Sequence, residues 1–133
     1  MSQSAAPKIN PILGPNVMKL GVMAFNCSGG STVTTAPEAW PMTWPDNVAL
    51  AQMADRAGFE ALLPVGRWKG YGGASNFNNR TFETFTWAAG LAAVTEQIAV
   101  LSTVHAPLVH PLIAAKQAAT IDHISGGRFV LNL

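Results

Sequence analysis

The stretch "TIDHISGGRFVLNL", Thr120 to Leu133, joins an expected helix to an expected strand through two glycines. Gly126 and Gly127 are typical of a helix C-terminus, and the apolar residues after them are typical of a strand covered on both faces. A parallel strand with nothing beyond it leaves an open edge, which proteins usually protect. We therefore expect the chain to be the front part of a larger parallel sheet.

The rest of the chain repeats the same alternation of helix and strand. The strands read as continuous apolar runs, which favours a parallel sheet covered by helices. In the first helix, Leu50, Met53, Ala54 and Ala57 recur at helical spacing and predict its buried face. The order is β-α-β-α-β-α-β, with strands at 17–25, 59–65, 97–104 and 128–133 and helices at 43–58, 81–96 and 108–125.

Two architectures fit this order: a small open α/β sheet, or the first half of a TIM-type (β/α)8 barrel. A complete barrel takes about 250 residues. The open last strand and a charged fraction of only 11% favour the half-barrel, because both suggest surface that is covered by more protein. We expect a flexible leader over residues 1–16 and the N-terminal half of a barrel domain over residues 17–133.

Composition excludes several classes of function. The net charge is +1 with no basic stripe, so nothing favours nucleic-acid binding. No apolar stretch approaches the roughly 18 residues of a membrane helix, and the first residues lack a signal-peptide core. Cys27 is the only cysteine, which excludes a disulfide within the chain and favours a reducing cytoplasm. No histidine pair has metal-binding spacing with a carboxylate, so we expect no metal.

Functional groups of parallel β/α folds collect in the loops after the strands. The loop "GRWKGYGG" (66–73) follows the second strand: Gly66 lets backbone approach a ligand, Arg67 could hold an anion, and Trp68 could stack on a ring. The alternative is a solvated loop. The spacing matches neither a phosphate-binding P-loop nor a dinucleotide-binding glycine motif. Asn26, in the loop after the first strand, is a further residue expected to line the site.

Three polar residues accompany the third and fourth strands. His105 would point toward the barrel mouth, as an acid or base near neutral pH or as a histidine satisfied within its loop. Thr103 and Asn132 interrupt apolar runs near strand ends, and they contact either a polar ligand or the loop backbone.

The segments "GLAAVTEQIAV" (90–100) and "PLIAAKQAATIDHISGGRFVLNL" (111–133) resemble the bacterial-luciferase-like family of flavin-dependent monooxygenases. The most specific part is A-x-x-A-A-T-I-D-x-I-S-G-G-R-F-x-x-N. "RWKGYGG" and "ETFT" (83–86) resemble the branch of pyrimidine, dimethylsulfone and alkanesulfonate monooxygenases. The resemblance covers residues 17–133 and the front half of the family's barrel.

The resemblance implies a barrel that takes reduced FMN from a separate NAD(P)H-dependent flavin reductase. With O2 it would oxidise a small sulfur- or nitrogen-containing molecule, and the complete protein would be a homo-oligomer. Phosphate sites of such barrels commonly follow strands seven and eight. We therefore expect this chain alone to bind FMN weakly and to be inactive.

The resemblance also implies roles for single residues. Cofactor contacts are carried over to Leu63, Val65, Gly66, Arg67 and Asn132. Catalytic roles fall on Arg67, Thr103 and Asn132, which could donate hydrogen bonds to charge that develops on oxygen. Gly66 departs from the pyrimidine branch, which carries a bulky aliphatic residue there, and His105 has no counterpart.

Two other readings stay open at this point. The chain could belong to a deazaflavin-dependent oxidoreductase of the same superfamily. Identifying the bound flavin would distinguish this enzyme from an FMN-dependent monooxygenase. The chain could also be a non-catalytic half-barrel that pairs with another copy through its sheet edges, which a size measurement would separate.

Overall fold

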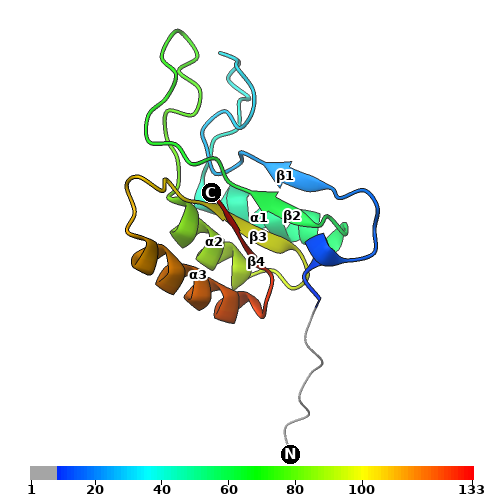
Figure 1. The fold of residues 1–133 in the computed structure, drawn as a ribbon. Helices are drawn as coiled ribbons and strands as arrows, with labels where there is room; N and C mark the ends of the chain where they lie inside the picture. The colour runs from blue at the N-terminus through cyan, green and yellow to red at the C-terminus, as the bar shows by residue number, and fades with distance from the viewer. Residues whose placement is uncertain (1–8) are drawn as a thin grey trace, which may run out of the picture.

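The computed structural model describes residues 9–133, and it confirms the alternating order of strands and helices (Figure 1). A short 3-10 helix precedes the first strand at Pro11–Leu13. The remaining elements are β1 (Gly21–Met23), α1 (Trp44–Arg56), β2 (Ala61–Leu63), α2 (Thr84–Ala92), β3 (Ala99–Thr103), α3 (Pro111–Ser125) and β4 (Phe129–Asn132).

The four strands form one parallel sheet in sequence order, β1-β2-β3-β4. Its register places Val22 beside Leu62, Leu62 beside Val100, and Val100 beside Phe129, so these side chains share one face. All four belong to or pack against the core that also contains residues of the three helices. The helices therefore cover this one face of the sheet.

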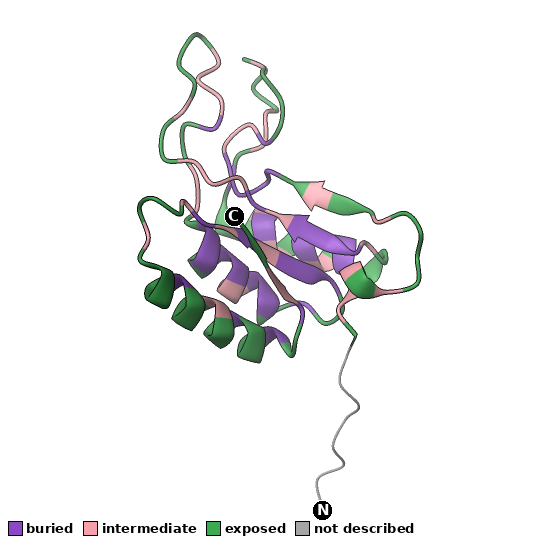
Figure 2. Cartoon of the chain, in the orientation of Figure 1, coloured by how far each residue is buried: buried purple, intermediate pink, exposed green. Residues whose placement is uncertain are grey.

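The core between the sheet and the helices consists of small, branched aliphatic and aromatic side chains. Figure 2 shows the buried residues concentrated in β2, β3 and α2. Leu62, Leu91 and Val100 are fully buried, and Trp87 is 2% exposed. The Trp87 and Phe25 rings meet edge to face, with their centres 4.9 Å apart. The other face of the sheet carries alternate residues such as Met23, which is 60% exposed. This is the arrangement of a barrel segment, with helices outside and the second strand face inside.

Each helix begins at a side chain that accepts backbone N–H groups. Thr43 caps α1 by accepting from Asp46 N, Glu83 caps α2, and His110 caps α3 through Nδ1, which accepts from Leu112 N at 3.2 Å. The expected stop at the double glycine is confirmed: Gly126 has a φ of +67° at the end of α3. A left-handed residue at this position favours glycine.

The buried face of α1 differs from the predicted one. Met53 is 60% exposed, whereas Asn47, Ala51, Ala54 and Asp55 are buried. Asn47 and Asp55 can be buried because both are hydrogen-bonded. Asn47 Oδ1 accepts from the indole N–H of Trp87 at 2.8 Å, and the Asp55 carboxylate accepts from backbone N–H groups ahead of β3. Periodicity of apolar residues could not identify a face that includes two hydrogen-bonded polar groups.

The expected leader, residues 1–16, begins with eight residues that lie outside the described part of the chain. Within residues 9–16, Asn16 Nδ2 donates to Glu60 Oε1. The first strand is shorter than expected, because only Gly21–Met23 pair with β2, and Leu20 O accepts from Glu60 N and Ala61 N where the pairing starts. None of the helices within residues 9–133 has the length and apolar character needed to cross a membrane.

Candidate functional site

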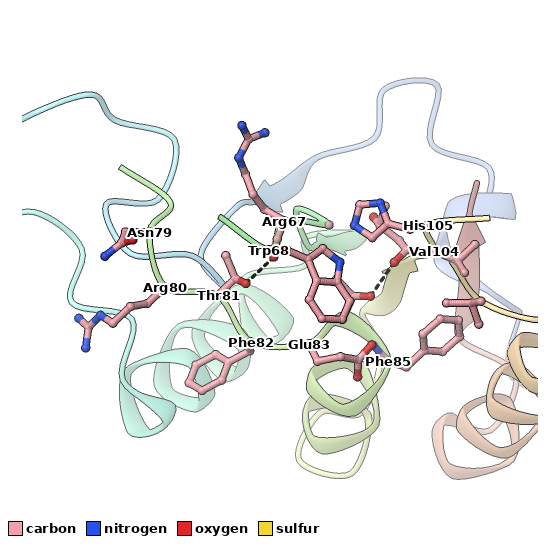
Figure 3. A pocket seen from close by; sticks show the side chains of 14 residues that line it. Arg67, Trp68, Asn79, Arg80, Thr81, Phe82, Glu83, Phe85, Val104 and His105 are labelled. Atoms are coloured by element: carbon pink, nitrogen blue, oxygen red, sulfur yellow. Dashed lines mark hydrogen bonds between the residues drawn. The ribbon is translucent and has the colours of Figure 1, made fainter. Parts of the chain in front are cut away.

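A cavity of about 430 Å³ opens where β2 and β3 end and α2 begins (Figure 3). Five of the residues predicted from the sequence line it: Gly66, Arg67, Trp68, Thr103 and His105. The other lining residues come from the approach to α2, its first turn, and the segment after β3: Asn79, Arg80, Thr81, Phe82, Glu83, Thr84, Phe85, Val104 and Val109. The volume is in the range of small-molecule sites.

Asn26 lies beside the cavity but does not line it. Its side chain is fully buried, and it binds both backbone groups of Val65: Oδ1 accepts from Val65 N at 2.9 Å and Nδ2 donates to Val65 O at 3.0 Å. Leu63, the last residue of β2, accepts a hydrogen bond from Ala24 N. Asn26 thus determines how the chain leaves β2, and neither Leu63 nor Val65 reaches the cavity lining.

Thr103 and Asn132 are brought together at the ends of β3 and β4. Asn132 Nδ2 donates to Thr103 Oγ1 at 3.2 Å, and the Thr103 hydroxyl donates to Pro64 O at 3.1 Å. The chain of bonds links the ends of three neighbouring strands. In this arrangement the Thr103 proton is committed to Pro64, and Asn132 keeps one amide hydrogen for another partner.

Arg67 is held by an aromatic stack in its own loop. Its guanidinium carbon lies 3.4 Å from the centre of the Tyr71 ring, which is parallel to the Phe77 ring at 4.5 Å. Nε also donates to Lys69 O. Figure 3 shows the guanidinium directed away from Glu83 and Phe85. The sequence predicted Arg67 but not this stack, because Phe77 reaches Tyr71 only through the fold of the loop.

The start of α2 contributes residues that sequence reasoning left out. Glu83 accepts from Phe85 N and Thr86 N. Burial raises the pKa of Glu83, but the backbone N–H groups of Thr86 and Phe85 outweigh it and leave the pKa below its ordinary value of 4.5. The carboxylate is therefore charged at neutral pH and already engaged by the helix. The sequence could have indicated Glu83, because it directly precedes an apolar helix, where a capping residue is expected.

Cys27 is unsuited to act as a nucleophile in this fold. The side chain is fully buried, and burial raises the pKa of the thiol to about 11, although a backbone hydrogen bond from Val65 and the charge of Arg67 oppose the rise. We expect the folded chain to resist alkylation by iodoacetamide until the pH approaches about 11. Mass spectrometry of the labelled chain, with a urea-unfolded sample as control, measures this. Rapid labelling of the folded chain at neutral pH would contradict it.

A parallel β/α sheet with a cavity at the carboxyl ends of its strands is typical of β/α proteins that bind ligands at this edge. A family model described as luciferase-like monooxygenase matches residues 18–133, and the chain belongs to this family. The expected fold class, the first half of a (β/α)8 barrel, is confirmed by this match and by the solved structures that resemble the chain.

Individual relatives agree with that assignment. The chain is 40% identical over 135 residues to the pyrimidine monooxygenase RutA of Shigella flexneri serotype X, covering 98% of this chain and 35% of RutA. It thus spans about a third of this relative's length. The EDTA monooxygenase EmoA of Chelativorans sp. BNC1 has the same fold with a TM-score of 0.71 and 19% identity, covering 86% of this chain and 28% of EmoA. The riboflavin lyase RcaE, solved with modified FMN and riboflavin, matches with a TM-score of 0.71 and 21% identity, covering 86% of this chain and 29% of RcaE.

Proposed function

We propose that this chain forms the first half of a flavin-dependent monooxygenase barrel that uses reduced FMN and O2. The substrate is a small nitrogen- or sulfur-containing organic molecule, and the similarity to RutA favours a pyrimidine. A separate NAD(P)H-dependent reductase would supply the reduced flavin in the cytoplasm, and the complete enzyme would be a homo-oligomer. The observation that supports this most directly is the cavity at the ends of β2 and β3 in a chain of this family.

The residues around the cavity suit a flat, polar-edged group such as a flavin. Gly66 has room for no side chain: a Cβ there would lie 2.9 Å from Thr103 Cγ2 and 3.1 Å from His105 Nε2. The end of β2 therefore lies directly against the two side chains at the end of β3. His105 Nε2 is buried without a hydrogen-bond partner, which leaves one polar atom for a ligand. Gly66 and Asn132 are the residues we expect to contact the ring, whereas Leu63 and Val65 support the end of β2 behind the cavity lining.

When bound, reduced FMN would supply the electrons that activate O2. Asn132 can donate its remaining amide hydrogen to developing negative charge, since its other hydrogen goes to Thr103. Arg67 can reach the same region only by leaving the Tyr71 ring. Thr103 acts chiefly by orienting Asn132, because its own proton is bonded to Pro64 O.

An exchange of segments tests the proposal. A chimera in which this chain replaces the matching third of Shigella flexneri RutA should consume O2 and oxidise a pyrimidine with reduced FMN. Asn132→Leu in the chimera should lower kcat roughly a hundredfold, the usual effect of removing one preorganised donor. The exposed His123→Gln change on α3 is the control and should leave kcat unaltered.

A chimera that folds and binds FMN but oxidises nothing would refute the activity. Equal rates for the chimera with and without Asn132→Leu would refute the role of Asn132. Activity with a reduced deazaflavin in place of FMN would instead favour the deazaflavin-dependent alternative.

A further inference from the structure

The imidazole of His105 contains a polar atom that the protein itself does not use. Nε2 is buried and has no hydrogen-bond partner, a condition that Asn78 Oδ1 shares among the buried side-chain atoms of residues 9–133. Asn78 does not line the cavity, whereas His105 does. Because buried polar atoms of folded proteins nearly always have a partner, Nε2 is where a ligand is expected to provide one.

The neighbouring glycine lies directly against Nε2. A Cβ on Gly66 would lie 3.1 Å from Nε2 and 2.9 Å from Thr103 Cγ2. A side chain at this position would therefore displace the imidazole or Thr103. The glycine at the end of β2 allows the imidazole after β3 to keep its place, with Nε2 buried at the edge of the cavity.

Several other polar side chains of the cavity are committed to the protein. Glu83 accepts two backbone N–H groups. The threonine hydroxyls donate to carbonyl oxygens, from Thr81 to Arg67 at 2.6 Å, from Thr84 to Thr103 at 2.7 Å and from Thr103 to Pro64 at 3.1 Å. The guanidinium of Arg67 rests on Tyr71. Unlike these groups, Nε2 of His105 can bond a ligand without giving up a hydrogen bond to the protein.

Trp68 lies next to this nitrogen and is only loosely held. Its ring centre is 6.3 Å from that of His105, with the planes at 52°, and the residue is 75% exposed. Since Nε2 is shielded from solvent, a ligand reaches it only when a neighbour moves. Trp68 is an exposed neighbour that can move without disturbing the core, and once displaced its indole offers a flat apolar face to a ring.

We propose that His105 Nε2 and Trp68 form a subsite for the N–H/C=O edge of an uncharged planar nitrogen heterocycle. His105 bonds the edge and Trp68 covers the ring. Neutral imidazole can donate or accept at Nε2, and a cyclic amide edge presents a partner for either tautomer. The subsite rests on the proposed function, because a pyrimidine substrate and the dione edge of a flavin both have this chemistry.

Nuclear magnetic resonance of the RutA chimera, labelled with ¹⁵N-histidine, tests the subsite directly. The ¹⁵N resonance of His105 Nε2 should shift on titration with uracil and should stay in place with benzene, which has a flat ring but no polar edge. His105→Phe keeps the ring shape without the nitrogens. It should weaken uracil binding about tenfold and leave benzene binding unchanged. His123→Phe, at an exposed position of α3, is the matched control.

Titration with FMN shows whether the subsite binds the pyrimidine substrate or the dione edge of the flavin. A shift with uracil assigns the subsite to substrate, and a shift with FMN alone assigns it to the cofactor. The proposal is overturned if neither compound moves the Nε2 resonance or if His105→Phe binds uracil as tightly as the unaltered chimera. Failure of the proposed function is recognised separately, by loss of FMN-dependent oxidation in the chimera whatever happens at His105.

Discussion

Replacing Arg128 with methionine is expected to lower the free energy of unfolding by about 4 kcal/mol. The side chain is 3% exposed and sits just ahead of β4. Its guanidinium donates to five acceptors that join the ends of α2 and α3 to the start of β3: Ser125 O, Thr95 Oγ1, Thr95 O, Ile98 O and Ala92 O, at 2.7, 3.1, 3.0, 2.7 and 2.9 Å. Methionine fills much of the same volume but leaves these buried acceptors without donors.

Urea unfolding followed by tryptophan fluorescence measures the loss. Arg128→Lys keeps the charge, yet one nitrogen cannot reach acceptors on both sides, so an intermediate loss is expected. Arg56→Met at the exposed end of α1 is the control and should change the free energy of unfolding by less than about 0.5 kcal/mol. A loss below about 1 kcal/mol for Arg128→Met would show that the bonds add little to stability.

The order of elements was predictable because the signals are local. Pro45, Pro111 and the two glycines at 126 and 127 mark helix ends whatever surrounds them, and apolar runs mark strands. The predicted boundaries were too wide at the strands. Val17 and Met18, apolar and expected in the first strand, lie outside β1 and are exposed, because strand ends depend on the pairing partner rather than on hydropathy.

The candidate site was predictable only in part. Position after a strand indicated Gly66, Thr103 and His105, and the structure places all three around one cavity. The bonding of Asn26 to Val65 and the stacking of Arg67 on Tyr71 depend on how separate loops meet. Such contacts have no periodicity in the sequence, so they appear only once the chain is folded.

Buried polar residues were the least predictable feature of the fold. Asp55 falls within a helix of mixed character, and nothing in its sequence neighbourhood distinguishes it from an exposed carboxylate. Its role comes from residues more than forty positions away: Oδ2 accepts from Glu96 N, and Oδ1 accepts from Gln97 N and Ile98 N, at 2.7, 2.9 and 2.7 Å. The carboxylate thereby ties the end of α1 to the entry of β3.

Asp55→Ala is expected to lower the free energy of unfolding by about 3 kcal/mol, because three backbone N–H groups lose a charged acceptor. Asp55→Asn should cost less, since its carbonyl oxygen can still accept from Gln97 and Ile98 while its amide group opposes Glu96 N–H. Urea unfolding at neutral pH measures both. Asp122→Asn, at an exposed position of α3, is the control and should have little effect.

The pH dependence of the free energy of unfolding shows whether Asp55 stabilises the fold through its negative charge or only through the geometry of its hydrogen bonds. Burial raises the pKa of Asp55, but the N–H groups of Glu96, Ile98 and Gln97, with the charge of Arg128, outweigh it and bring the pKa below 3.8. A carboxyl whose pKa is lowered by folding stabilises the protein above its unfolded pKa, and the contribution disappears as pH falls through the folded value. The difference in stability between the parent chain and Asp55→Asn should therefore be constant at neutral pH and shrink below about pH 3.8. A difference that stays constant through this range would show that geometry, not charge, makes Asp55 stabilising.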